Sequence, residues 1–219
     1  MELRSAFHRE LEVVDLQVRR LFALVIEAIG GATDALLAGD RQAARDLVAR
    51  DDLLDALYVD VEKVVQRQFA LQGPLATDLR FLLSVLRIVP ELERSGDLAE
   101  HIAQCAARGI TSELTPRLRG LIQQMGRVGV SLWQESARVY DSREAGAGER
   151  LRDLDDELDD LHVSFIAELA SGKVSVPVAI ELALVGRFYE RLGDHAVNIG
   201  GRVDYIATGG FKPRPGDET

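Results

Sequence analysis

The sequence is poor in aromatic residues, proline and cysteine, and each shortage narrows the range of folds. Aromatic residues make up 5% of the 219 residues and there are only six prolines, whereas leucine, alanine, valine, arginine and acidic residues are plentiful. This composition is typical of a helical protein. The single cysteine, Cys105, excludes an internal disulfide and suits a reducing compartment. We expect it to fill a small apolar site.

Clustered basic charge and long apolar runs are also scarce. The net charge is −10 and no basic face is visible, which argues against binding of nucleic-acid phosphates. The first ten residues lack the apolar core of a signal peptide, and no apolar run approaches the roughly 18 residues of a membrane span. We therefore expect a soluble, cytoplasmic protein whose partners are basic or cationic.

Apolar spacing predicts six long helices in two sets of three. Hydrophobic residues are 47% of the chain, enough for a packed core. The helices are expected over 3–38, 40–71, 75–108, 114–140, 147–170 and 177–207. We predict an all-α fold of two tandem three-helix bundles, 1–110 and 111–208, followed by a disordered tail at 209–219.

Two short segments indicate that the halves are related by internal duplication. ERSGDLAEHIA at 93–103 and ERLGDHAVNIG at 190–200 are identical at six of eleven positions, 97 residues apart. The same shift maps one apolar seam onto another. The first seam consists of Phe81, Val85, Ile88, Leu92, Ser95, Ala99, Ile102 and Ala106, and the second of Val178, Leu182, Val185, Tyr189, Leu192, Ala196, Ile199 and Val203. Both follow the 4-3 alternation of a bundle helix, so the two halves should bury the same face.

The repeated motif places two acids four residues apart, just off the buried seam. Glu93 and Asp97 correspond to Glu190 and Asp194, and a glycine lies within each pair. Like charges at this spacing disfavour a helix by roughly 0.2–0.5 kcal/mol, and glycine by up to about 1 kcal/mol. Because both halves keep this destabilising arrangement, we expect it to serve a function. The simplest function for paired carboxylates is to bind a cation at the surface.

A second repeat, shifted by 104 residues, adds carboxylates from the preceding helix of each half. Asp51 and Asp55 correspond to Asp155 and Asp159. Two antiparallel helices pack about 8–10 Å apart, so the two pairs in each half can meet at one surface patch. Oxygen ligands favour Mg, Ca, Mn or Fe and also admit Zn. Because the chain has 36 acidic residues, a solvated acidic face stays an open alternative for these four aspartates.

The two halves also differ near the motif. Pro90 has no counterpart in the second half and is expected to kink or interrupt its helix just before the first pair of acids. His101 matches Asn198, so we expect a polar surface residue there. We expect His195 to be packed or hydrogen-bonded and not a ligand.

The segment ERLGDHAVNI, its first-half version ERSGDLAEHI and PLATDLRFLLSVL at 74–86, together with the duplication, resemble the PhoU family of bacterial phosphate-signalling regulators. The resemblance covers nearly the whole chain. It implies two tandem three-helix bundles that bind multinuclear metal clusters at their surface through pairs of E(D)xxxD motifs. The implied ligands of Fe, Mn, Zn or Mg are Asp51, Asp55, Glu93 and Asp97 in the first half and Asp155, Asp159, Glu190 and Asp194 in the second.

The resemblance also implies a function. It predicts a cytosolic adaptor without enzymatic activity, which links a phosphate ABC transporter ATPase to a sensor histidine kinase and helps repress the phosphate-starvation response. We expect a homodimer that binds no nucleic acid.

Two other classes of protein stay open. A carboxylate-bridged di-iron enzyme also uses a helical bundle, but it needs two inward-facing Glu-x-x-His motifs. The sequence has none, and the nearest arrangement is Asp159 with His162. The other alternative is a metal-free helical scaffold whose acidic residues only keep it in solution.

Overall fold

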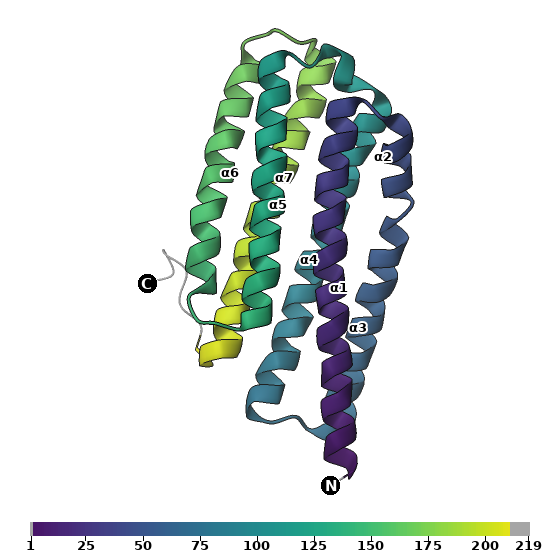
Figure 1. The fold of residues 1–219 in the computed structure, drawn as a ribbon, viewed down its shortest axis with the longest axis vertical. Helices are drawn as coiled ribbons and strands as arrows, with labels where there is room; N and C mark the ends of the chain where they lie inside the picture. The colour runs from purple at the N-terminus through teal and green to yellow at the C-terminus, as the bar shows by residue number, and fades with distance from the viewer. Residues whose placement is uncertain (1, 211–219) are drawn as a thin grey trace.

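The computed structural model describes residues 2–210, with side chains from residue 6 onward except that of Asp51. Every regular element in this part of the chain is helical (Figure 1). The elements are α1 (Glu2–Ala38), α2 (Arg41–Val48), α3 (Asp51–Gln72), α4 (Ala76–Arg108), the short 3₁₀ helix η1 (Ile110–Glu113), α5 (Pro116–Ser142), α6 (Ala147–Ala170) and α7 (Val176–Thr208). The predicted all-α fold is confirmed. Of the expected disordered tail, 211–219 lies outside the described residues.

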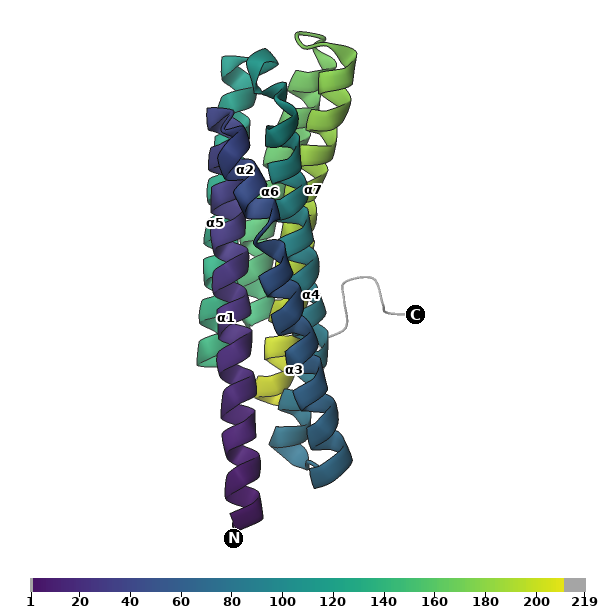
Figure 2. The ribbon, with the colours of Figure 1, turned by 90° about the vertical axis from the view of Figure 1, so that its right-hand side faces the viewer.

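Four helices form the centre of the molecule, and the others pack outside them. α1, α4, α7 and α5 contact one another in a ring, so the two sets of three helices share one continuous core (Figures 1 and 2). α3 packs on α1 and α4, and α6 packs on α5 and α7. The acidic motifs of α4 and α7 therefore have an outer helix, α3 or α6, as their neighbour.

The helix expected over 40–71 is divided into α2 and α3. The carboxylate of Asp40 caps α2 by accepting hydrogen bonds of 3.0 Å from the backbone N–H groups of Gln42 and Ala43. α2 ends at Val48, before α3 begins at residue 51. If α2 and α3 are taken as the two pieces of one helix, the six long helices in two sets of three are present. The corresponding second-half helix, α6, is unbroken.

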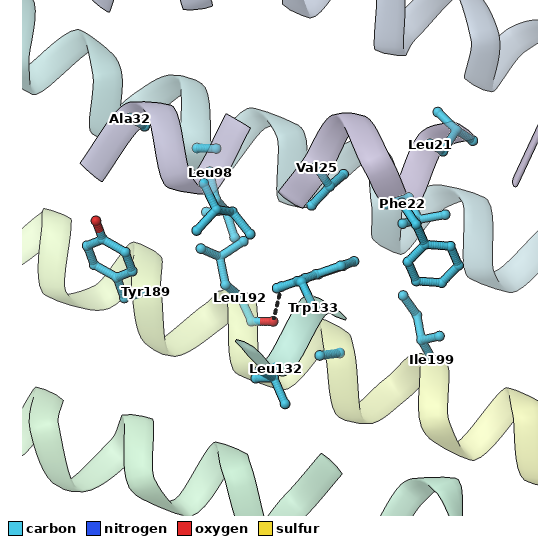
Figure 3. Packing of buried hydrophobic residues seen from close by; sticks show 14 of the residues in the cluster. Leu21, Phe22, Val25, Ala32, Leu98, Leu132, Trp133, Tyr189, Leu192 and Ile199 are labelled. Atoms are coloured by element: carbon cyan, nitrogen blue, oxygen red, sulfur yellow. Dashed lines mark hydrogen bonds between the residues drawn. The ribbon is translucent and has the colours of Figure 1, made fainter. Parts of the chain in front are cut away.

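Both predicted seams are buried. All residues of the first seam are buried, and so are those of the second except Val178, which is partly exposed. Polar groups at the seam find partners: the indole nitrogen of Trp133 donates to the carbonyl of Leu192 at 3.2 Å (Figure 3). The hydroxyl of Tyr189 lies 2.6 Å from that of Thr33 on α1. Large aromatic side chains can thus fill the core without leaving a buried polar atom unpaired.

His195 lies inside the core and connects α7 to α4 through a hydrogen bond. The prediction that it is packed or hydrogen-bonded is confirmed. Its Nδ1 lies 2.9 Å from the hydroxyl of Ser95, and the same hydroxyl donates to the carbonyl of Glu91 at 2.7 Å. Burial lowers the pKa of His195 to about 4, so the ring is neutral at physiological pH. Cys105 is buried as expected, and burial raises the pKa of its thiol to about 12.

Pro90 does not interrupt α4, which is continuous from Ala76 to Arg108. The expected interruption before the first motif is therefore not present. Proline inside a helix costs about 3 kcal/mol because one hydrogen bond is lost. The packing of α4 against α1, α3 and α7 outweighs that loss.

The prediction that no apolar segment reaches the length of a membrane span is wrong for helix α1. Within Ala6–Ala38 it has an 18-residue window with few charges, and its mean hydropathy of 1.8 meets the criterion for a span by length and composition. The apolar residues are spread along the helix, so no uninterrupted run reveals them. Several are fully buried against other helices, as in a core helix, which passes the same test: Val14, Val18, Leu21, Phe22, Val25, Ile29 and Leu36.

Asp204 of α7 caps the start of α6. Its carboxylate accepts hydrogen bonds of 2.7–3.1 Å from the backbone N–H groups of Gly146, Ala147 and Gly148. Helix α6 begins there with unsatisfied donors and the positive end of its dipole, so a carboxylate is a favourable partner. This contact fixes α6 on α7 in the half that carries the second acidic motif.

Candidate functional site

Three of the four first-half acids converge on the outer face of α3 and α4. Oxygen atoms of Asp55, Glu93 and Asp97 lie within 4.8 Å of one another. Glu93 and Asp97 are half-buried, and Asp55 is exposed. Asp51 is the first residue of α3, one turn before Asp55, and its side chain lies outside the described part of the chain. Carboxylates this close repel one another unless a proton or a cation lies among them.

The pKa values of the first cluster are shifted in the direction that this repulsion predicts. The pKa of Glu93 is raised, chiefly by desolvation and then by the charges of Asp97 and Asp55. The pKa of Asp97 is raised by desolvation and by Asp55, with His101 acting in the opposite sense. Raised carboxyl pKa values mean that the surrounding protein does not fully stabilise the negative charge of the carboxylates. A bound cation would do so.

The second-half acids share the outer face of α6 and α7 but are less tightly grouped. The pKa of Asp155 is raised to about 7, first by burial and then by the charges of Asp159 and Asp194. Desolvation is also the largest cause of the raised pKa values of Asp159 and Glu190. The four carboxylates therefore act on one another. However, no three of these four, all of them described, bring their oxygen atoms within 4.8 Å.

Two oxygen atoms of the second cluster are buried without a hydrogen-bond partner, Oδ1 of Asp155 and Oε2 of Glu190. Leaving such an atom unsatisfied costs about 1–3 kcal/mol. Buried polar atoms without a partner are rare and often mark a missing water or ion. The carboxylate-only donor set fits a hard divalent cation, and both orphaned atoms lack a partner that such a cation would supply.

Gly193 lets the carboxylate of Asp155 rest directly against α7. A Cβ at this position would overlap Oδ1 of Asp155 and would lie 3.1 Å from its Cγ. Gly193 stands between Glu190 and Asp194 in the sequence, so the aspartate of α6 is seated beside both acids of the α7 motif. The glycine of the motif thus has a packing explanation that also serves the acidic cluster.

Arg187 is a residue at this site that the sequence analysis did not single out. Its guanidinium forms an ion pair with Oε1 of Glu190, three residues later on α7. Its charge also lowers the pKa of Asp159 on α6, against the larger effects that raise it. The signal in the sequence was the i,i+3 spacing of arginine and glutamate, which places the two side chains on one helix face.

Comparison with known proteins gives consistent matches along the chain. The PhoU domain model matches residues 18–106 and 122–203, which include all eight predicted ligand positions. The chain is 33% identical over 210 residues to phosphate-specific transport system accessory protein PhoU homolog 1 of Mycobacterium tuberculosis strain H37Rv, covering 94% of this chain and 95% of that protein. It is 33% identical over 212 residues to homolog 2 of the same strain, covering 95% and 100%.

A solved structure supports the fold. The crystal structure of PhoU from Pseudomonas aeruginosa matches with a TM-score of 0.86 and 26% identity, covering 93% of this chain and 100% of that chain. The PhoU structure from Streptococcus pneumoniae has a TM-score of 0.82 at 23% identity and supports the same helical arrangement.

Replacing Gly193 tests the seating of Asp155. We expect Gly193→Ala to be less stable than Gly201→Ala by about 1 kcal/mol, because the added Cβ must push the carboxylate of Asp155 away from α7. Gly201→Ala, on the same helix, is the matched control, because an added Cβ there has no atom within 4 Å beyond the adjacent backbone of its own helix. It should be neutral or stabilising, by up to about 1 kcal/mol. Urea denaturation with chelator measures both, and equal stability of the two variants would contradict the packing.

The raised pKa of Asp155 predicts a pH dependence of stability in the presence of chelator. The folded protein holds a proton on Asp155 up to about pH 7, whereas the unfolded chain releases it near the ordinary value of 3.8. The contribution is therefore fully present below about pH 4 and is lost as the pH rises to about 7.

Asp155→Asn removes that titrating group, so its melting temperature should fall less than that of wild type between pH 4 and 7. Asp160→Asn, at an exposed position of the same helix, is the control and should keep the wild-type slope. Parallel profiles for wild type and Asp155→Asn would show that the pKa of Asp155 is not raised.

Proposed function

The chain belongs to the PhoU family, and on that premise we propose that it regulates phosphate uptake and phosphate-starvation signalling as a protein without catalytic activity. The observation that carries the proposal is the 33% identity to PhoU homologues over nearly the full length of both proteins. Those relatives are named as accessory proteins of the phosphate-specific transport system, and the Streptococcus pneumoniae structure as a phosphate transport system regulatory protein.

The proposed role is that of a cytoplasmic, homodimeric adaptor between a phosphate ABC transporter ATPase and a sensor histidine kinase. The negative charge of the chain, −10 overall, favours contact with basic surfaces on such partners. Its two repeats, 1–110 and 111–208, would give it two similar units, each with one acidic cluster on its outer side.

We further propose that each cluster binds divalent or trivalent metal ions, either Fe, Mn, Zn or Mg. The proposed ligands are those named from the sequence: Asp51, Asp55, Glu93 and Asp97, and Asp155, Asp159, Glu190 and Asp194. A bound cation would neutralise the repulsion between the carboxylates of an outer helix and those of its inner neighbour. The close oxygen atoms of the first cluster and the orphaned oxygen atoms of the second support this proposal.

The positions of the acids argue against the di-iron enzyme. Such enzymes hold their metals inside the bundle, between facing helices. Here Asp55, Asp159 and Asp194 are exposed on the outer faces, and the centre of the bundle is filled by apolar side chains. This arrangement favours a surface cluster.

Replacement of the motif acids tests the metal sites. Glu93→Gln with Asp97→Asn should remove about half of the Mn, Fe or Zn bound by the wild-type protein, because each half supplies its own ligands. Glu190→Gln with Asp194→Asn should remove the remainder. A control with Glu12→Gln and Asp160→Asn, both exposed positions outside the clusters, should keep the full content. Elemental analysis that finds unchanged metal in the quadruple variant would contradict the assignment.

Capture of partners tests the proposed role. The native protein should co-purify with a phosphate-transporter ATPase or a sensor kinase from its own cells. If acidic residues make the contact, capture should weaken at 1 M salt, where the Debye length falls to about 3 Å. Capture that is insensitive to salt would indicate an apolar interface. Turnover in Fe(II) oxidation by the purified protein would contradict a non-enzymatic role.

A further inference from the structure

The two acidic clusters carry the same acids but different neighbouring residues. A shift of 97 residues places Arg187 of α7 opposite Pro90 of α4, three residues before Glu190 and Glu93 respectively. Pro90 has no charge and no side-chain donor. The second cluster therefore has a cation at a position where the first has none.

Arg187 contacts the second cluster directly. Its guanidinium pairs with Oε1 of Glu190, and the other oxygen, Oε2, is buried without a partner. The charge of Arg187 also acts on Asp159, which comes from α6. Half of the arginine side chain is exposed, 52%, so it can swing into solvent without leaving a hole in the core. Arg187 thus partly neutralises carboxylates from both helices of the cluster.

Among the described side chains, which do not include that of Asp51, the first cluster has no equivalent ion pair. Arg94, which matches Arg191 under the same shift, lowers the pKa of Glu93 through its charge. Its guanidinium lies 3.9 Å from the carboxylate of Glu91, which is not one of the proposed ligands. Asp55, Glu93 and Asp97 converge to within 4.8 Å without a guanidinium bound to any of them at ion-pair distance among the described side chains. Within the described part of the chain, Asp55, Glu93 and Asp97 therefore lack the direct ion pair that Glu190 has.

We propose that Arg187 is a resident counter-ion of the second cluster, which holds Glu190 in the metal-free protein and moves aside when a divalent cation binds there. This inference rests on the proposed metal sites and adds an order to them. A cation that binds through both oxygens of Glu190 displaces Arg187 from Oε1, and one that binds through Oε2 alone is repelled by the nearby guanidinium. That cluster therefore binds the cation more weakly than the first and fills after it. An exposed ion pair corresponds to a factor of up to about five in affinity.

The experiment isolates the second cluster in the full-length chain. In a Glu93→Gln/Asp97→Asn background, titration with Mn²⁺ followed by electron paramagnetic resonance of the free ion gives the dissociation constant of the remaining cluster. Adding Arg187→Gln should tighten binding about two- to five-fold. Arg187→Lys keeps the positive charge and should stay close to the arginine protein.

Arg191→Gln is the matched control. Arg191 is an exposed arginine four residues further along α7, and it forms no ion pair with a carboxylate of the cluster. The substitution removes the same charge from the same helix, so any general electrostatic effect should be common to both variants. The excess effect of Arg187→Gln over Arg191→Gln measures the contribution of the ion pair.

Thermal melting provides a readout that a merely structural role would not produce. With chelator, Arg187→Gln should melt below wild type, because its acids lose their internal counter-ion. With excess Mn²⁺ the variant should gain more in melting temperature than wild type does, because it binds the ion more tightly. A structural role for Arg187 predicts the same deficit under both conditions.

The possible results distinguish a failure of this inference from a failure of the proposed metal sites. Absence of Mn²⁺ binding to the wild-type protein would overturn the metal sites and this inference with them. Binding to both clusters with equal affinity, or equal effects of Arg187→Gln and Arg191→Gln, would overturn the role of Arg187 and leave the sites in place. Two-step binding in wild type, with the weaker step tightened only by Arg187→Gln, is the result expected.

Discussion

The burial of two long apolar seams, one on α4 and one on α7, is the constraint on which the other features depend. Each seam packs against the helices of the central ring, so the residues one position off the seam must lie at the junction with an outer helix. Glu93 and Glu190 occupy such positions and are half-buried. The packing that stabilises the bundle therefore also desolvates the motif acids, and desolvation is the largest cause of their raised pKa values.

Features that depend on helix periodicity could be predicted from the sequence, because a 3.6-residue repeat fixes which side chains share a face. The buried seams, the all-α fold and the surface position of the acids belong to this group. Features set by contacts between distant segments could not be predicted. The seating of Asp155 against Gly193 is such a feature, because it depends on two helices that meet in the fold. The apolar window of α1 is different: it is present in the sequence, but its apolar residues do not form an uninterrupted run. Pro90 inside an unbroken helix shows tertiary packing overriding a local preference.

The second acidic cluster departs from several local preferences of a helix at one place. A glycine inside α7, carboxylates at like-charge spacing and an orphaned buried oxygen each lower stability when considered alone. In the structure they are parts of one arrangement: Gly193 removes the Cβ that would block Asp155, and Asp155 then lies beside the acids of α7. Sites that break several local rules together are the expected locations of function.

The two halves carry the same acids because of the duplication. The affinity of a carboxylate cluster for a cation also depends on which positive groups already neutralise its negative charge in the metal-free protein. At the second cluster Arg187 provides that charge from within the chain, and at the first the matching residue is Pro90. A resident cation lowers the repulsion in the metal-free state, and it lowers by the same interaction the gain from binding a metal. If the proposed metal sites hold, two clusters with the same acids would respond to different concentrations of one cation, because a single position outside those acids differs between the halves.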